Sequence, residues 1–137
     1  PGMKILVFAF DGDCANPFLP HNYTPNSVVY TGTHDNDTVL GWYQRADEKV
    51  SDFARRYLAR AGHDIAWDLI RAAWGSVAVF ALAPMQDLLS LDNRARMNFP
   101  STLGGNWEWR MKPSALTKSL AVRLKEQNQL YGRLTPK

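Results

Sequence analysis

Three short apolar runs constrain the fold of this chain more than any other feature. They span residues 4–10, 27–30 and 77–83, and their length and their β-branched and aromatic residues are typical of strands. Helical patterns separate the second run from the third. A strand, helices and a further strand in succession predict βαβ units, an α/β fold and a parallel sheet, and the first strand is expected to be buried on both faces.

Helical spacing is clearest between residues 50 and 61, where the apolar side chains form one stripe. Asp47 precedes this stripe as a candidate N-cap, and Gly62 follows it as a stop signal. A shorter helical pattern begins near Gly41. The middle of the chain is therefore predicted to be helical.

Three further helical segments are predicted around the third apolar run. Asp64 can cap a helix that continues to Gly75, in which the two Trp side chains are expected to pack rather than to bind a ligand. Residues 85–89 should form a short turn or helix. The last helix is predicted over residues 113–132, with a proline at its start and a glycine at its end, before Pro136.

Composition narrows the class of protein. With 45% hydrophobic and 21% charged residues, the chain has the balance of a soluble globular protein, and we treat residues 1–137 as a single unit. The net charge of +3 comes from scattered Lys and Arg, which argues against nucleic acid as a partner. No apolar run approaches the roughly 18 to 20 residues that span a bilayer, so no membrane association is expected.

The cysteine content and the chain start point to a compartment and a context. The single Cys14 cannot form an internal disulfide, and no Cys and His spacing resembles a zinc site. Residues 11–13 do not continue as an EF-hand, because the sixth position lacks Gly and the twelfth lacks Glu. We therefore expect a cytoplasmic protein without a metal or other cofactor. The start at Pro1, with no leader, predicts a segment of a larger protein.

Polar residues are most concentrated in residues 31–38, directly after the second apolar run. In barrels built from eight βα units, side chains at the carboxyl ends of strands reach the substrate, and His34 and Asp35 occupy that place. The alternative is that Asp35 or Asp37 only caps the next helix, and for Asp37 we favour this alternative. The pair His34 and Asp35 is thus the first candidate for a functional site.

A second candidate lies in a glycine-rich stretch near the end of the chain. Trp107 and Trp109 alternate there, and alternation in an extended segment places two rings on one face. Aromatic faces of this kind are platforms for sugars. Core packing is the alternative interpretation for either residue.

Taken in order, these loops resemble the carboxyl-terminal third of the 4-α-glucanotransferases called amylomaltases or disproportionating enzymes, glycoside hydrolase family 77. Any one motif alone would be weak, but their joint order is specific. The matching stretches are Pro1-Gly2-Met3-Lys4 with Phe8-Ala9-Phe10, Asn16-Pro17-Phe18-Leu19-Pro20-His21-Asn22-Tyr23, Tyr30-Thr31-Gly32-Thr33-His34-Asp35-Asn36-Asp37-Thr38, Pro84-Met85-Gln86-Asp87-Leu88-Leu89, and Ala95-Arg96-Met97-Asn98 with Gly105-Asn106-Trp107.

The resemblance implies a retaining enzyme on a (β/α)8 TIM barrel, in which two carboxyl groups about 5 to 5.5 Å apart act as nucleophile and general acid/base. These would follow the fourth and fifth strands and would therefore precede Pro1. The present chain would supply about strands six to eight with their helices. Its own contribution would be Asp35, which in the family hydrogen-bonds hydroxyls of the sugar being cleaved and helps to hold its ring distorted.

The same resemblance implies roles for other residues. His34 would donate a hydrogen bond to the same sugar, and Asn98 would line the donor side from the loop after the last strand. Contact with the acceptor is assigned by analogy to the loop that carries Asp11 and Asp13. Arg96 is expected to pair with a carboxylate.

Four further residues of the matching motifs are expected to be supporting rather than sugar-binding. His21 and Asn22 should brace their loop, and Gln86 and Asp87 should stand behind the residues that touch the sugar. The expected partners are α-1,4-glucans and maltooligosaccharides. Because three strands of a barrel leave two open edges, the isolated chain is expected to self-associate and to be inactive.

Two alternatives to a glucanotransferase segment remain open from the residues. The first is a fragment of an α-amylase-like hydrolase, since the His and Asp pair recurs in that wider group. The second is a free-standing carbohydrate-binding module without chemistry. The loop over residues 16–23 favours the transferase, and the open sheet edges make an independent module the less natural design.

Overall fold

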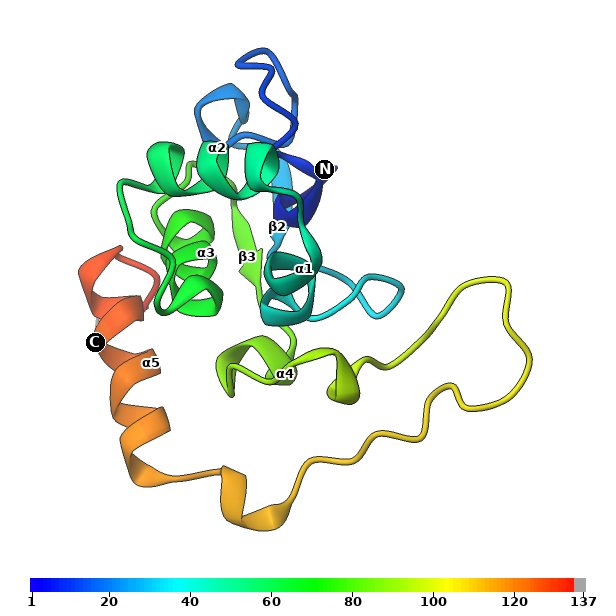
Figure 1. Cartoon of the computed structure of the whole chain (residues 1–137). Coiled ribbons are helices and arrows are strands. Elements are labelled where there is room, and N and C mark those ends of the chain that lie inside the picture. The colour runs from blue at the N-terminus through cyan, green and yellow to red at the C-terminus, as the bar shows by residue number, and fades with distance from the viewer. Residues whose placement is uncertain (135–137) are drawn as a thin grey trace.

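A parallel three-stranded sheet lies at the centre of the computed structural model, which describes residues 1–134 (Figure 1). The strands are β1 (Gly2–Ile5), β2 (Ser27–Tyr30) and β3 (Phe80–Leu82), in the order β1-β2-β3. Both neighbouring pairs are parallel. The predicted α/β pattern with a parallel sheet is confirmed. Pro136, which was expected to follow the end of the last helix, lies outside the described residues.

The first and third strands are shorter than the apolar runs that predicted them. After Ile5 the chain turns into a 3-10 helix, η1 (Leu6–Phe8), so the strand prediction is wrong for residues 6–10. The turn brings Leu6 and Phe10 inside the core, where they are 0% and 2% exposed. A bend of the backbone buries these side chains. A continuous apolar run is compatible with such a bend as well as with a buried strand, so the sequence pattern could not separate the two. The third run likewise forms a strand only at Phe80–Leu82.

The two faces of the sheet differ in burial. Val29 points into the core and is 0% exposed. On the other face the register aligns Met3, Val28 and Phe80 in one row, and Met3 and Phe80 are 56% and 60% exposed. The expectation that the first strand is buried on both faces is therefore wrong for this chain, because its helices pack against only one face.

Three helices follow β2. They are α1 (Val39–Arg45), α2 (Glu48–Leu58) and α3 (Ile65–Trp74). The N-cap prediction for α2 is confirmed, since the Asp47 carboxylate accepts the Val50 N–H at 2.9 Å. The helix ends earlier than the apolar stripe, because Ala59 adopts a left-handed backbone with φ of 52°.

The caps of α1 and α3 differ from prediction. Thr38, not Asp37, caps α1, and its hydroxyl accepts the Gly41 N–H at 3.1 Å. Asp37 instead forms an ion pair with Arg45 in the last turn of the same helix. Asp64 makes no cap hydrogen bond, because its carboxylate binds a guanidinium of the last helix.

After β3 the chain continues through short helical turns and a long loop to the last helix. The short helix α4 (Met85–Leu88) confirms the predicted turn or helix, and a 3-10 turn, η3 (Asn93–Ala95), follows it. Figure 1 shows the next segment running away from the body and returning at a second 3-10 turn, η4 (Pro113–Ala115), before α5 (Lys118–Leu130). The last helix thus begins later than predicted, because Thr117 caps it and the proline starts a separate turn.

Polar and aromatic contacts hold α5 against α3. The indole N–H of Trp74 donates to the Asn128 side chain at 3.1 Å, and the Arg123 guanidinium lies 3.9 Å from the centre of a Trp67 ring. Trp67 and Trp74 are both buried, which confirms that they pack. In residues 1–134 no helix has both the length and the apolar character that crossing a bilayer requires.

The close approach of α1 to the loop before it gives a stability prediction. A Cβ added at Gly41 would lie 2.6 Å from both carboxylate oxygens of Asp37, and that side chain is held by Arg45 and by the Thr38 N–H. The clash in Gly41→Ala should lower the free energy of unfolding by about 1 to 3 kcal/mol. Ala also favours the helix by about 1 kcal/mol relative to Gly. We expect the clash to outweigh this gain, so the variant should be less stable than the wild type.

Urea denaturation of the wild type and the variant measures this difference. Gly2→Ala is the matched control, because no atom lies within 4 Å of the added Cβ. A variant with Ala at position 41 that is more stable than the wild type would contradict the packing described for Asp37.

Candidate functional site

An open pocket of about 680 Å³ lies where the three strands end. Its wall includes the last residues of the strands, Ile5, Tyr30 and Leu82. Further wall residues come from the loop over residues 32–38, from the segment after β3 and from Arg96, Met97 and Trp107. The carboxyl ends of parallel strands thus bring together loops that are distant in sequence, as the sequence predicted for the residues after β2.

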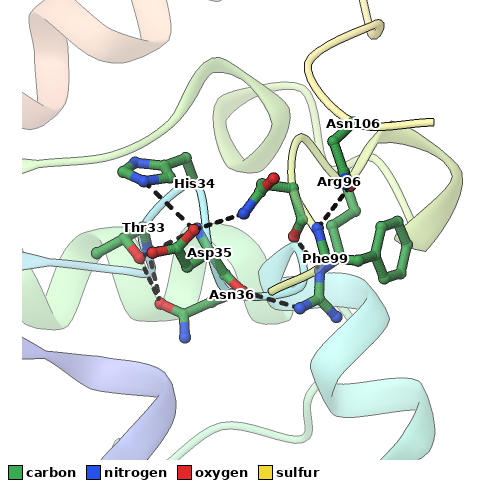
Figure 2. Close-up of polar contacts among 8 residues, drawn as sticks. Thr33, His34, Asp35, Asn36, Arg96, Phe99 and Asn106 are labelled. Carbon is green, nitrogen blue, oxygen red and sulfur yellow. Dashed lines mark hydrogen bonds and ion pairs between the residues drawn. The ribbon is translucent and has the colours of Figure 1, made fainter. Parts of the chain in front are cut away.

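A tight turn after β2 presents the candidate acid. The side-chain oxygen of Asn36 accepts the Thr33 N–H at 2.9 Å and the Thr33 hydroxyl at 3.0 Å, and the Asn36 N–H donates back to the Thr33 carbonyl at 3.2 Å. Figure 2 shows this closed turn with His34 and Asp35 at its tip. Their side chains are 55% and 52% exposed, so both can reach a ligand.

Two predicted site residues, His34 and Asn98, contact the carboxylate of a third, Asp35. The side-chain N–H of Asn98 donates to Oδ1 of Asp35 at 2.7 Å, across 63 positions of sequence. Nε2 of His34 lies 3.3 Å from the same oxygen. His34 and Asp35 belong to the pocket wall, whereas Asn98 is not a wall residue and is tied to the wall through Asp35. A few convergent polar groups of this kind are a feature of ligand sites.

Arg96 does not have the partner that was expected. Its guanidinium donates to the backbone carbonyl of Asp35 at 2.8 Å and to that of Asn98 at 2.9 Å, as Figure 2 shows for the first contact. No carboxylate pairs with this side chain among residues 1–134. The expectation of an ion pair is wrong, because the folded chain offers two carbonyls that sequence does not reveal.

Trp107 lines the pocket instead of packing in the core. Its ring centre lies 4.9 Å from that of His34, and the residue is 53% exposed. The backbone is held in a left-handed conformation with φ of 63°, and its N–H donates to the Met97 carbonyl at 2.7 Å. Trp109 is not among the pocket residues, so the two rings do not form one platform there.

Asp87 is a buried acid in the pocket wall. Its carboxylate accepts the Thr31 hydroxyl at 2.6 Å and the Val39 N–H at 2.8 Å, and the residue is 2% exposed. Burial raises the pKa of Asp87 above its ordinary value, and the two hydrogen bonds oppose part of this rise. The neighbouring Gln86 donates to the Ala95 carbonyl at 3.2 Å. Both residues belong to the pocket wall, so the expectation that they stand behind it is wrong for this pocket.

The loop with Asp11 and Asp13 lies apart from this group. The Asp11 carboxylate accepts the Asp13 N–H at 2.9 Å, which holds the pKa of Asp11 below its usual range. Asp13 accepts the Ala15 N–H at 2.9 Å. Both side chains are exposed, and neither belongs to the pocket wall.

His21 and Asn22 brace that loop. The His21 ring lies 3.0 Å from the Tyr57 hydroxyl and 2.8 Å from the Cys14 carbonyl. Asn22 donates to the carbonyls of Cys14 and Asn16, both at 2.9 Å. In the described part of the chain, no three His, Cys, Asp or Glu side chains cluster closely enough to hold a metal ion.

Comparison with known proteins places this geometry in context. A sequence profile of the family described as 4-alpha-glucanotransferase matches residues 1–117. The chloroplastic/amyloplastic 4-alpha-glucanotransferase of Arabidopsis thaliana is 49% identical, over 98% of this chain and 24% of that protein. The 4-alpha-glucanotransferase of Clostridium butyricum is 48% identical, over 97% of this chain and 28% of that protein. The chain thus spans about a quarter of the length of these relatives.

A solved structure agrees with the sequence relatives. The amylomaltase from Streptococcus agalactiae in complex with acarbose superposes with a TM-score of 0.92 at 38% identity. The match covers 96% of this chain and 27% of that protein. The three parallel strands and their helices therefore correspond to part of the amylomaltase fold.

The buried Asp87 predicts a pH dependence. Because its pKa is raised on folding, its contribution to stability is complete below the unfolded pKa, near 3.8, and is lost as the pH rises through the folded pKa. The amide side chain at position 87 of the Asp87→Asn variant does not titrate. The unfolding free energy of the wild type relative to this variant should therefore decrease as the pH is raised from about 4 to 7.

Urea unfolding at a series of pH values measures this difference. Asp92→Asn is the control, because hydrogen bonds from Arg94 lower the pKa of Asp92 and its contribution is lost only at more acid pH. The difference between wild type and Asp92→Asn should stay level from about pH 5 to 7. A rising difference for Asp87→Asn would contradict the burial described for this carboxylate.

Proposed function

Because the chain belongs to the 4-alpha-glucanotransferase family, glycoside hydrolase family 77, we propose that it is part of an enzyme that transfers a segment of an α-1,4-glucan. The acceptor is the 4-hydroxyl of glucose or a maltooligosaccharide, and the anomeric configuration is retained. The observation that carries the proposal is the contact of Asn98, from another loop, with Asp35, which lines the pocket together with His34. The acarbose bound by the solved relative supports a carbohydrate as the ligand class.

In this proposal Asp35 binds hydroxyls of the sugar whose bond is broken and stabilises the transition state. Hydrogen bonds to the 2-hydroxyl strengthen as the oxocarbenium-like centre develops, so an ionised acceptor contributes more there than in the ground state. His34 and Asn98 bind the same sugar on the donor side. The half-exposed ring of Trp107 offers an apolar surface beside them.

The bond-making groups lie outside this chain in the proposal. The nucleophile and the general acid/base follow the fourth and fifth strands of a (β/α)8 barrel, and this chain supplies strands six to eight. The exposed sheet face with Met3 and Phe80 supports this arrangement, because parallel sheets are covered on both faces. Asp11 and Asp13 serve the acceptor side, and the lone Cys14 supports a reducing, cytoplasmic setting.

Substitution of Asp35 in the complete enzyme tests the proposal. Asp35→Asn keeps the shape but removes the charge, and we expect turnover with maltotriose to decrease by about 100-fold or more, as for other transition-state contacts. Asn98→Ala should raise KM for the donor and lower turnover less, since a neutral hydrogen bond contributes about 0.5 to 1.5 kcal/mol and a hydrogen bond to a charged group contributes more. The melting temperature should be little changed.

Asp52→Asn is the matched control, because this exposed carboxylate pairs with Arg56 on α2, away from the pocket. It should leave both turnover and melting temperature unchanged. Near-normal turnover of Asp35→Asn would refute its assignment, and a larger loss in Asn98→Ala than in Asp35→Asn would refute the order of the two roles.

The chain alone should show no transfer, because a retaining mechanism needs a nucleophile and a proton donor at one bond. It should also self-associate, since Met3 and Phe80 lie on an uncovered face and β1 and β3 are sheet edges. Incubation with maltotriose and light scattering measure the two properties. Production of glucose and longer maltooligosaccharides by a monomer would contradict this prediction.

A further inference from the structure

We propose that Arg96 is the positioning residue that fixes Asp35 and Asn98 relative to each other, and that it acts through their backbone. This inference rests on the proposed function and deepens it. Arg96 donates from NH2 to the Asp35 carbonyl at 2.8 Å and from Nε to the Asn98 carbonyl at 2.9 Å. One planar group therefore joins the two loops that carry the sugar-binding side chains (Figure 2).

Asp35 needs such a support because little else holds it. Its side chain is 52% exposed, and its carboxylate is contacted by the side chains of Asn98 and His34. Its N–H makes only a long contact of 3.3 Å to the Thr33 hydroxyl. A direct bond between two exposed side chains on separate loops orders them weakly, whereas a charge-assisted bond to the backbone fixes the position of the whole residue.

Arg96 is itself well anchored. Its N–H donates to the Asn93 carbonyl at 3.1 Å at the end of η3, and Gln86 of α4 holds the preceding Ala95 carbonyl at 3.2 Å. Its guanidinium lies 4.4 Å from the centre of the Phe99 ring. Stacking and two directed bonds leave the side chain few rotamers, so it is preorganised for its role.

A further contact extends the support into the glycine-rich loop. The side chain of Asn106 accepts the Phe99 N–H at 2.8 Å, as Figure 2 shows. Phe99 therefore keeps its ring against the guanidinium through a contact seven residues along the chain. The support for Asp35 thus runs from Asn106 to Phe99 and Arg96, and none of these contacts requires a ligand.

Neither the methyl group of alanine nor the ammonium group of lysine can reproduce this geometry. An ammonium group is a point charge on a flexible stem, while the fork of arginine can direct two bonds at two separate carbonyls. Arg96→Ala should therefore lower kcat of the complete enzyme with maltotriose by about 10- to 100-fold, because a displacement of about 1 Å at a reacting centre can cost 100-fold. KM should rise less than kcat falls, since Asp35 acts mainly in the transition state and Asn98 supplies the weaker contact with the donor.

Three comparisons make the test specific. Arg94→Ala is the matched control, because Arg94 is two positions away, is highly exposed and pairs only with Asp92 among residues 1–134. Arg96→Lys should recover only part of kcat. Guanidinium ion at millimolar concentration should recover part of kcat in Arg96→Ala, which a merely structural role would not produce. Melting temperatures monitor folding of every variant.

Each outcome decides the inference. Normal kcat in Arg96→Ala, or full recovery in Arg96→Lys, overturns it. A raised KM with unchanged kcat overturns it by assigning Arg96 to direct sugar binding. If the wild-type enzyme transfers no glucan, the proposed function is wrong. The affinity of the same variants for acarbose then tests the positioning role alone. Weaker binding by Arg96→Ala than by Arg94→Ala supports this role. Equal binding by the two variants overturns it.

Discussion

The buried carboxylate of Asp87 is the interaction on which the arrangement of the site depends. It receives one hydrogen bond from Thr31, directly after β2, and one from Val39, the first residue of α1. These two residues are the ends of the loop that carries Asp35. A single side chain of α4 therefore closes the base of the loop and links it to the third strand. Burying this acid is costly, and its two directed bonds offset part of the cost.

The tip of the loop is fixed by different means from its base. Thr33 and Asn36 close the turn through local hydrogen bonds, and Asp37 is tied to Arg45 of α1. Between these contacts Asp35 points outward and meets Asn98 from the other loop. The sequence thus builds a rigid base from buried groups and leaves exposed only the side chains that a ligand would touch, which keeps the cost of ordering them low at the moment of binding.

Sequence alone could predict the features that depend on local pattern. The parallel sheet, the Asp47 cap and the packing of the two Trp residues of α3 follow from periodicity and capping chemistry. The cap of α1 could not be chosen this way, because Asp is the better N-cap type by preference, yet Asp37 pairs with Arg45 and Thr38 caps the helix instead. The partners of Arg96 are 61 positions away in one case, so no local rule identifies them.

The backbone of Trp107 gives an independent argument for a ligand at this pocket. A left-handed conformation costs a non-glycine residue roughly 1 to 2 kcal/mol, and glycines already stand at positions 104 and 105, where positive φ angles also occur. An aromatic residue kept in this conformation, with 53% of its surface exposed, gains little from core packing. Such strain persists where the side chain has a use. The strained backbone and the exposed ring beside His34 therefore support the sugar contact that we propose for this pocket.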